Sequence, residues 1–344
     1  MKKILVIGGT GTMGGYLCPM LAQKGYEVDA IAGEIKKDAG GVRYHFANAL
    51  DNQVLEKFLS NGYDAVVDFM WYREMPLYES RYKMLLNQTD HYFALSSYRV
   101  YADSPNAPLT ENSPRLSESL DPSDTWHNFD GYAQVKCKME DLITASDGKN
   151  WTILRPSIVY CPGRVPFLTW SKNEVVLRAY AGKKIVLPRE ALDKKTTMVW
   201  GEDVAKMITG LMFNPVAKKE IYNIATAESL TWGELLEYYQ KTLGLEAEFC
   251  DTEEFLQIIM RESTSEIQRN WAKFILLYDR LYDRSVDNSK ILESAGMRQS
   301  DLMQLYEGIK FELSRLPAGA IRPAVDVNER MDAYLAAVHQ EEFC

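Results

Sequence analysis

Residues 1–15 read MKKILVIGGTGTMGG, and this stretch decides the fold. Ile4 to Ile7 form a short, continuously apolar run, as expected of a strand that is buried on both faces of a parallel sheet. Three glycines follow at every third position: Gly8, Gly11 and Gly14. Such a turn needs residues without Cβ, because the main chain must take unusual backbone angles, approach a pyrophosphate closely and pack a helix tightly on a strand.

The segment after the glycines, residues 16–24, has the character of a helix. Its N-terminus offers free N–H groups and the positive end of the helix dipole to phosphate groups. A flexible turn is the alternative interpretation of a glycine triplet, but the strand before it and the helix after it favour a dinucleotide site. The spacing Gly-x-x-Gly-x-x-Gly resembles the short-chain dehydrogenase/reductase superfamily.

The composition is that of a globular enzyme, since 46% of the 344 residues are apolar and 25% are charged. A chain of this length can bury a large core. The net charge of −9 would repel a phosphate backbone, and no run of Lys or Arg is longer than two residues. The composition therefore argues against nucleic acid as the main ligand.

The sequence also constrains localisation and metal binding. Met1 is followed by Lys2-Lys3 and by only four strongly apolar residues before the glycines, too few for the core of a signal peptide. No apolar stretch approaches the length of a membrane span. The five cysteines contain no Cys-x-x-Cys pair, and the four histidines lie far apart. We therefore expect a cytoplasmic protein with reduced thiols, no membrane contact and no metal site.

Strands and helices alternate along the first half of the chain. Further strands are predicted at 27–32, 43–46, 64–70, 91–97 and 151–154, and helices at 52–60, 76–88 and 130–146. Asp51 is placed to cap the first of these helices. Successive strand-helix units imply right-handed crossovers and hence a parallel, doubly wound α/β sheet. Residues 103–125, rich in Pro, Ser and Asp, are predicted to be a surface excursion.

The remainder of the chain has mixed character. Helices are predicted at 172–182, 202–213, 231–243 and 287–313, and strands at 184–187 and 220–224. Aromatic and aliphatic residues at helical spacing within 252–283, Trp271 among them, are interpreted as helix-packing core. The tail, residues 314–344, holds an amphipathic helix near 326–339 that could dock on the body or on a partner.

The ends of two predicted strands bear on the cofactor. Ligands of open α/β sheets bind at the carboxyl ends of strands, so residues 69–72, the C-terminal end of the strand predicted at 64–70, should line the cofactor crevice. An acidic residue after the second strand suits the ribose of NAD, and a basic one suits the extra phosphate of NADP. That strand is followed by Gly33, Glu34 and, a little later, Lys36-Lys37. Glu34 argues for NAD and the lysines for NADP, so both remain open.

Three residues carry the predicted chemistry. Ser97 closes a predicted strand, and Tyr132 and Lys136 lie four residues apart at the start of a predicted helix. Because the two share one helix face, the ammonium can lower the pKa of the phenol and bond a ribose hydroxyl. Such a tyrosine can take a proton from an alcohol while hydride leaves for nicotinamide, or return it, and Ser97 would polarise the same oxygen. A surface phenol beside a solvated lysine is the alternative interpretation.

With these motifs on one chain, residues 1–313 resemble the extended short-chain dehydrogenase/reductases, the family of NAD-dependent sugar-nucleotide epimerases and dehydratases. Four further stretches carry the resemblance: residues 108–114, 154–163, 201–205 and 221–224. The resemblance implies a Rossmann domain and a smaller C-terminal α+β substrate lobe. The expected division is a Rossmann domain over 1–165 with parts of 183–225, a lobe over 166–182 and 226–313, and the tail.

The resemblance also implies roles for matching positions. Catalysis falls to Ser97, Tyr132 and Lys136, and the strand end Arg155-Pro156 looks like the segment that holds the nicotinamide. The residues expected to contact the cofactor, NAD or NADP, are Gly8, Thr10, Gly11, Thr12, Met13, Gly14, Gly33, Asn48, Ala49, Phe69, Met70, Pro156 and Ile158. A homodimer is expected as well. The apolar stripe for it would be Val135, Met139, Leu142 and Ile143, unless these residues are buried as core.

Two departures from the family pattern concern the substrate. Family 4,6-dehydratases carry an Asp-Glu pair directly after the serine or threonine, and the residues here are Tyr98 and Arg99, which disfavours that reaction. An arginine that grips the substrate diphosphate in many epimerases is replaced by Thr196, with Arg280, Arg284 and the neighbouring lysines as candidate substitutes. The candidate substrate residues are Tyr98, Arg99, Lys195 and Arg284. For Arg99 a structural ion pair is the alternative interpretation.

The sequence thus predicts an NAD(P)-dependent enzyme that acts on a secondary alcohol or ketone of a sugar or sugar-nucleotide-like substrate. If the ketone stays bound and takes hydride back on its other face, the enzyme is an epimerase, and otherwise a dehydrogenase or reductase. The same three residues serve both reactions. The alternative is a non-catalytic or RNA-binding protein on the same scaffold, because chloroplast stem-loop RNA-binding proteins are similar members of the extended family.

Overall fold

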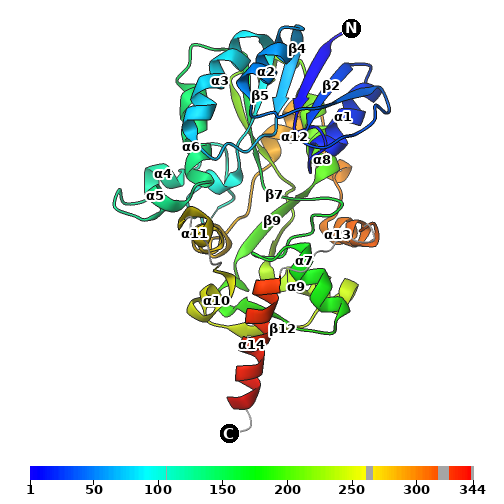
Figure 1. The fold of residues 1–344 in the computed structure, drawn as a ribbon. Helices are drawn as coiled ribbons and strands as arrows, with labels where there is room; N and C mark the ends of the chain where they lie inside the picture. Colours follow the sequence, from blue (N-terminus) through cyan, green and yellow to red (C-terminus); the bar gives the residue numbers. More distant parts are fainter. Residues whose placement is uncertain (106, 261–265, 317–324, 342–344) are drawn as a thin grey trace.

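A seven-stranded sheet forms the upper part of the molecule, as Figure 1 shows. Its strand order is β10-β6-β5-β4-β1-β2-β3, and all neighbouring strands are parallel. The strands are β1 (Lys3–Ile7), β2 (Glu27–Ala32), β3 (Val42–Phe46), β4 (Tyr63–Asp68), β5 (Thr89–Leu95), β6 (Trp151–Pro156) and β10 (Glu220–Ile224). The predicted parallel α/β sheet of the Rossmann type is therefore confirmed.

The structure is a computed structural model, and it describes residues 1–105, 107–260, 266–316 and 325–341. Parts of the predicted helical segment 252–283 and of the predicted tail lie outside the described residues: 261–265, 317–324 and 342–344. Among the helices that are described, none combines the length and the apolar character needed to cross a bilayer.

Helices cover both faces of the sheet. On one face lie α1 (Gly14–Gln23), α8 (Gly201–Leu211) and α12 (Ser289–Ala295), and on the other α2 (Asn52–Leu59), α3 (Met75–Asn87) and α6 (Ala133–Thr144). Ile4 and Val6 join the core on the α1 side, whereas Leu5 and Ile7 join the opposite core. This two-sided burial explains the continuous apolar run of β1. The strand order reverses between β1 and β4, and open α/β sheets bind ligands beyond the strand ends at such a point.

The apolar stripe of α6 is used inside the chain. Val135, Met139 and Ile143 are buried in the core that α6 shares with α3. Leu142 is partly buried against the same core. The core interpretation of the stripe therefore holds for these residues, and the homodimer stays a prediction.

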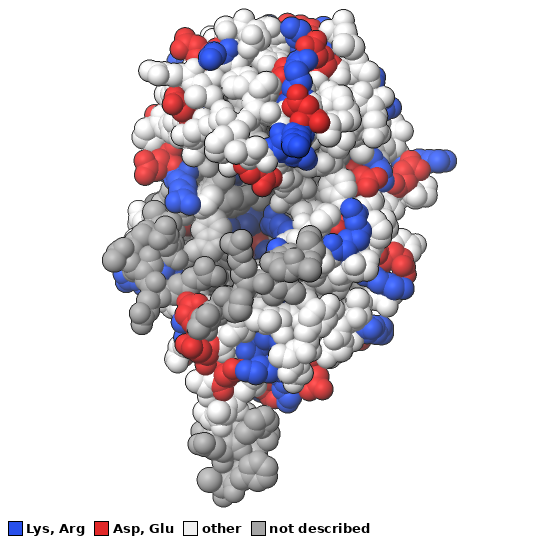
Figure 2. Space-filling model, turned by 45° about the vertical axis from the view of Figure 1, so that its right-hand side comes forward, with Lys and Arg blue, Asp and Glu red and all other residues white. Residues whose placement is uncertain are grey.

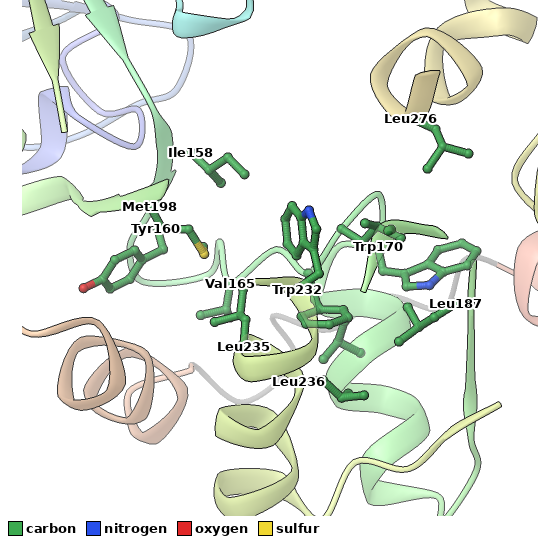
Figure 3. Close-up of a cluster of buried hydrophobic side chains, with 14 of the residues drawn as sticks. Ile158, Tyr160, Val165, Trp170, Leu187, Met198, Trp232, Leu235, Leu236 and Leu276 are labelled. Atoms are coloured by element: carbon green, nitrogen blue, oxygen red, sulfur yellow. The ribbon is translucent and has the colours of Figure 1, made fainter. Parts of the chain in front are cut away.

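A smaller α+β lobe lies below the sheet in Figure 1 and contains a three-stranded sheet, β11-β9-β7, and a two-stranded sheet, β12-β8. Its strands are β7 (Ile158–Tyr160), β8 (Ile185–Pro188), β9 (Lys195–Trp200), β11 (Ser229–Thr231) and β12 (Ala247–Cys250). Its helices are α7 (Lys172–Tyr180), α9 (Trp232–Leu243), α10 (Thr252–Ile259), α11 (Glu266–Ile275), α13 (Leu305–Ser314) and α14 (Val325–Glu341). One apolar cluster joins them, and Figure 3 shows Trp232 and Leu236 of α9 near Trp170 and Leu187.

Several elements differ from the sequence-based expectations. The strands β7, β9, β11 and β12 were not expected. Residues 103–125 are more than a surface excursion, since they contain α4 (Leu116–Ser119), just before α5 (Trp126–Phe129), and Leu109 and Leu116 are buried. The tail helix α14 docks on the lobe, where Asp332 accepts a hydrogen bond from Arg178 Nη2 of α7 at 2.8 Å.

Candidate active site

The turn between β1 and α1 forms a cradle of bare main chain. Gly8 has a φ of +84°, which L side chains rarely adopt, and a Cβ on Gly14 would lie 2.4 Å from the carbonyl oxygen of Gly8. No side chain caps α1. The N–H groups of Thr12 and Met13 make no hydrogen bond with any residue that the structure describes. Free N–H groups at a helix N-terminus fit the pyrophosphate of a dinucleotide.

A cleft of about 530 Å³ begins at this turn and runs past the ends of β4, β5 and β6 to α11. Figure 2 shows a hollow between the upper and lower parts of the molecule, with basic side chains inside it. Most of the predicted cofactor residues line the cleft: Gly8, Thr10, Gly11, Thr12, Met13, Gly14, Phe69, Pro156 and Ile158. The glycine turn and the strand ends thus share one site, as the fold rule for open α/β sheets requires.

The other predicted cofactor residues do not line this cleft. Gly33 follows β2, and Asn48 and Ala49 follow β3, which pairs with β2 in parallel. Asn48 is exposed, and the carbonyl oxygen of Ala49 accepts a hydrogen bond from Arg81 at 2.7 Å. Met70 lies behind the glycine turn, where its sulfur would be 3.8 Å from a Cβ on Gly8. Gly33, Asn48 and Ala49 therefore lie on the side of the sheet toward which the adenosine of a bound cofactor would extend. Their contacts with the cofactor stay predictions.

Ser97 and Tyr132 line the same cleft as the glycine turn. Ser97 is buried and begins the 3-10 helix η1 (Tyr98–Val100), where its Oγ accepts a hydrogen bond from Arg99 N at 3.2 Å. Tyr132 is the residue before α6 rather than inside it, and its N–H donates to Asp130 Oδ1 at 3.0 Å. Two of the three predicted catalytic residues are thus brought to one wall.

Lys136 lies behind that wall and is fully buried. Its Nζ donates hydrogen bonds to the carbonyl oxygens of Leu95, at 2.6 Å, and Met70, at 3.5 Å, and lies 5.9 Å from the ring centroid of Tyr132. Burial lowers the pKa of Lys136 to about 8, although the charges of Asp68 and Glu140 act in the opposite direction. Lys136 is therefore a buried cation held one helical turn after the tyrosine.

Two indoles pack beside the ring of Tyr132 and against each other. The ring centroids of Trp71 and Trp271 lie 6.1 and 5.7 Å from that of Tyr132, and 5.2 Å from each other. Trp71, in the segment after β4, was expected at the crevice, whereas Trp271 of α11 was interpreted as core. Both line the cleft. Trp271 is therefore a residue of the cleft wall and not only of the core, as its sequence suggested. The sequence did not indicate this, because α11 and α6 are far apart along the chain.

Three further residues of the cleft were not predicted from the sequence. Ser157 separates β6 from β7, and its buried Oγ has no hydrogen-bond partner among the described residues. Arg164 follows the turn at Pro162-Gly163, and Ile275 ends α11. For Arg164, the Pro-Gly-Arg sequence after a strand was a usable signal. Ser157 lies between the predicted cofactor residues Pro156 and Ile158, which was a signal too, whereas nothing local marks Ile275.

The candidate substrate residues separate into two groups. Tyr98 and Arg99 line the cleft, where Tyr98 Oη donates to Asp279 Oδ2 at 3.0 Å and Arg99 Nη2 donates to Asp130 Oδ2 at 2.8 Å. Lys195 is exposed at the start of β9, and Arg284 is buried beside Asp279; neither lines the cleft. No cluster of three or more His, Cys, Asp or Glu side chains among the described residues could hold a metal ion.

Comparisons with known proteins give two distant relatives of this chain, both 26% identical to it. One is the chloroplast stem-loop binding protein of 41 kDa b of Arabidopsis thaliana, matched over 265 residues, 71% of this chain and 64% of that protein. The chain thus spans less than two thirds of this relative's length. The other is the spore coat polysaccharide biosynthesis protein SpsK of Bacillus subtilis, matched over 262 residues, 74% of this chain and 85% of that protein.

The fold is also similar to solved structures. The dTDP-glucose 4,6-dehydratase of Bacillus anthracis, in complex with NAD, superposes with a TM-score of 0.67 at 15% identity, covering 92% of this chain and 96% of that chain. Residues 4–225, well over half of the chain, match the model of the NAD dependent epimerase/dehydratase family. The resemblance found in the sequence is therefore confirmed, and the chain belongs to the NAD dependent epimerase/dehydratase family.

Proposed function

We propose that the protein is an NAD(P)-dependent oxidoreductase or epimerase that acts on a secondary alcohol or ketone of a sugar or sugar-nucleotide-like substrate. The observation that carries this proposal is that Ser97 and Tyr132 line the same cleft as the glycine turn. The bare main chain of that turn and the free N–H groups of Thr12 and Met13 fit a dinucleotide. When bound there, the nicotinamide would accept or donate the hydride.

Each residue has a distinct task in this proposal. Tyr132, as a phenolate, accepts the proton of the substrate hydroxyl as the hydride leaves its carbon, so that a carbonyl group forms. Ser97 donates a hydrogen bond to the same oxygen. The buried charge of Lys136, 5.9 Å from the tyrosine ring, stabilises the phenolate. The two indoles beside Tyr132 keep water from the reacting atoms.

The family and the name of SpsK, a polysaccharide biosynthesis protein, support a sugar-related substrate. Both epimerisation and net oxidation or reduction fit the same three residues. A 4,6-dehydratase remains disfavoured, because Tyr98 and Arg99 stand in the two positions after Ser97 and are bonded to Asp279 and Asp130. The likeness to a solved 4,6-dehydratase concerns the fold alone.

An RNA-binding protein on this scaffold is the second candidate, and the name of the Arabidopsis relative favours it. The net charge of −9 argues against it. On the face in Figure 2 acidic side chains are interspersed with basic ones over the surface outside the hollow. A basic stripe long enough to follow a nucleic acid backbone is not visible on that face.

One experiment separates these candidates. Mass spectrometry and absorbance of the natively purified protein would reveal a retained nicotinamide cofactor. If the protein contains none, fluorescence titration with NADH and NADPH would follow. Retained NAD supports an epimerase, and saturable binding of added cofactor supports a dehydrogenase or reductase. Binding of neither, together with binding of a stem-loop RNA, would replace the enzymatic proposal by the second candidate.

A further inference from the structure

A buried carboxylate gathers arginines at the wall of the cleft. Asp279 belongs to a π-helical turn, η4 (Leu276–Arg280), which continues α11, and π-helical turns occur frequently at functional sites. Asp279 Oδ2 accepts hydrogen bonds from Tyr98 Oη and Arg280 Nη1, and Asp279 Oδ1 accepts from Arg284 Nε at 2.9 Å. Arg99 Nε lies 3.9 Å from the same Oδ2 atom. The arginines therefore surround one fully buried acidic group.

Positive charge is in excess within this cluster. Its ion pairs join three arginines to two carboxylates: Arg99, Arg280 and Arg284 to Asp130 and Asp279. No other carboxylate of the described residues lies within 4.0 Å of these guanidinium groups. Taking a charge out of water is costly unless an opposite charge compensates it. The cluster as it stands lacks one negative charge.

The unused hydrogen-bond donors show where an anion would sit. Each nitrogen of Arg284 has a protein acceptor, since Nε donates to Asp279 Oδ1, Nη1 donates to Ala102 O and Nη2 donates to Tyr278 O. No described residue accepts a hydrogen bond from Arg99 Nε, from Arg99 Nη1 or from Arg280 Nη2. Arg99 and Arg280 both line the cleft, whereas Arg284 does not. The two open guanidinium edges thus belong to the two arginines that reach the cleft.

Arg99, one of the two arginines that line the cleft, adjoins the reacting residue. The Arg99 guanidinium carbon lies 5.2 Å from the ring centroid of Tyr132. Burial opposes the charge of Arg99, but the charges of Asp130 and Asp279 outweigh burial and raise its pKa, so the group remains a cation. Arg280 is fixed on its other edge by Leu168 O, at 2.9 Å from Nε. Planar, pre-oriented guanidinium groups of this kind suit carboxylates and phosphates.

We propose that Arg99 and Arg280 bind an oxyanion of the substrate, a carboxylate or a phosphate, beside the carbon at which Tyr132 acts. The proposal rests on the proposed function for the identity of that carbon. An oxyanion site at this place narrows the substrate class to acidic or phosphorylated sugars. Because the anion supplies the missing negative charge and accepts from two desolvated guanidinium groups, it contributes to binding as well as to orientation.

The test uses three sugar probes with the full-length protein at low ionic strength. Methyl β-D-glucuronide carries a carboxylate, glucose 6-phosphate a phosphate, and methyl β-D-glucoside is neutral. Binding is followed by the fluorescence of the cleft tryptophans. We expect one of the two anionic probes to bind at least roughly tenfold more tightly than the neutral one, the gain typical of charge-assisted hydrogen bonds. The two anionic arms distinguish a carboxylate from a phosphate.

Two variants and a control locate the effect. Arg280→Gln and Arg99→Lys should each reduce the preference for the anionic probe severalfold; Arg99→Lys retains the charge beside Asp130 and so protects folding. Arg73→Gln removes the same charge from an exposed side chain that stacks on Trp71 but does not line the cleft. It should retain the preference.

Three results would overturn the proposal: equal binding of anionic and neutral probes, binding of none of them, or a preference that survives both variants. NADH titration of the same samples is the independent check on the proposed function. Wild-type protein that prefers the anionic probe but fails to bind NADH and NADPH would leave the oxyanion site standing and remove the redox proposal. Protein that binds NADH or NADPH but shows no preference for an anionic probe would retain the redox proposal and remove the oxyanion site.

Discussion

The Nζ atom of Lys136, a fully buried residue, donates a hydrogen bond to the carbonyl oxygen of Leu95 at 2.6 Å. Leu95 ends β5, two residues before Ser97, so this bond joins the start of α6 to the strand that carries the serine. The ammonium is thereby kept near the tyrosine ring. Burial lowers its pKa to about 8, which means that the fold bears a cost for holding the charge there.

Lys136→Met should stabilise the protein at pH 7 while removing catalysis. The wild-type lysine has a depressed pKa in the folded state, so the unfolded chain binds the proton more tightly and wild-type stability rises with pH between about 8 and 10.5. The difference in the free energy of unfolding between Lys136→Met and the wild type should therefore decrease by about 2 kcal/mol from pH 7 to pH 9.5. Urea unfolding at both pH values measures it. The matched control is Lys138→Met, an exposed side chain on the same helix.

A Lys136→Met variant that is less stable than the wild type at both pH values would contradict this account. It would mean that the two carbonyl hydrogen bonds of Nζ outweigh the desolvation of the charge. A constant difference between the two pH values would contradict the depressed pKa itself.

Tyr132→Phe should abolish turnover without loss of cofactor binding. The Tyr132 hydroxyl makes no hydrogen bond with any described residue, so its removal leaves no buried group unsatisfied. The general acid–base step would be lost, which lowers kcat by about 10²- to 10⁴-fold. Steady-state kinetics on the substrate and NADH titration by fluorescence measure the two properties separately. A variant with undiminished kcat would place the proton transfer on another group.

The glycine motif and the strands of the main sheet were predictable because their causes are local. β1 is buried on both faces, which requires an unbroken apolar run. Gly8 has a positive φ, and a Cβ on Gly14 would clash with main chain. The part of the cleft wall that α11 and η4 form was not predictable in the same way. Trp271 and Arg280 come to the cleft through α11 and η4, more than 130 residues later in the chain, by lobe packing that no local pattern records.

The same reasoning explains the partial success with the arginines. Arg99 was recognised because it stands where the family has another residue, yet its partners Asp130 and Asp279 lie far away in sequence. Arg284 was proposed as a substitute for the diphosphate-binding arginine that Thr196 replaces, and the structure gives it three protein partners instead. β7 has only three residues and finds its partner in β9, so its sequence alone carries little information.

Gly14→Ala should weaken both cofactor binding and stability, whereas Gly15→Ala should do neither. A Cβ at position 14 would lie 2.4 Å from Gly8 O and 2.7 Å from Gly9 Cα, so the turn must move to accept it. Overpacking of this kind costs about 1–3 kcal/mol. A Cβ at position 15 meets its nearest atom, Thr10 O, at 3.9 Å, and alanine is the better helix former by about 1 kcal/mol.

Thermal unfolding and NADH titration of the two glycine variants give a direct comparison, since both positions lie in the first turn of α1. Equal NADH affinity in the two variants would mean that the packing of α1 on the turn does not shape the cofactor site.

Glu140→Gln should destabilise the protein far more than the same change at an exposed ion pair. Glu140 and Arg155 are both buried, with Arg155 Nε 2.8 Å from Glu140 Oε1 and Nη2 2.6 Å from Oε2. Neutralising one partner leaves an uncompensated buried guanidinium, at a cost of about 3–5 kcal/mol. Glu237→Gln, whose partner Lys241 is exposed, should cost about 0.3–0.5 kcal/mol.

The double variant Glu140→Leu/Arg155→Met distinguishes net stabilisation from the penalty of a broken pair. Because it removes both members of the ion pair, it should be more stable than Glu140→Gln, as measured by urea unfolding. Arg155 is followed directly by Pro156, which lines the cleft, so the single variant should also weaken NADH binding. If the double variant is the less stable of the two, the ion pair contributes stability that apolar packing does not replace. The Glu140–Arg155 ion pair would then stabilise the fold in addition to positioning β6 beside the cofactor site.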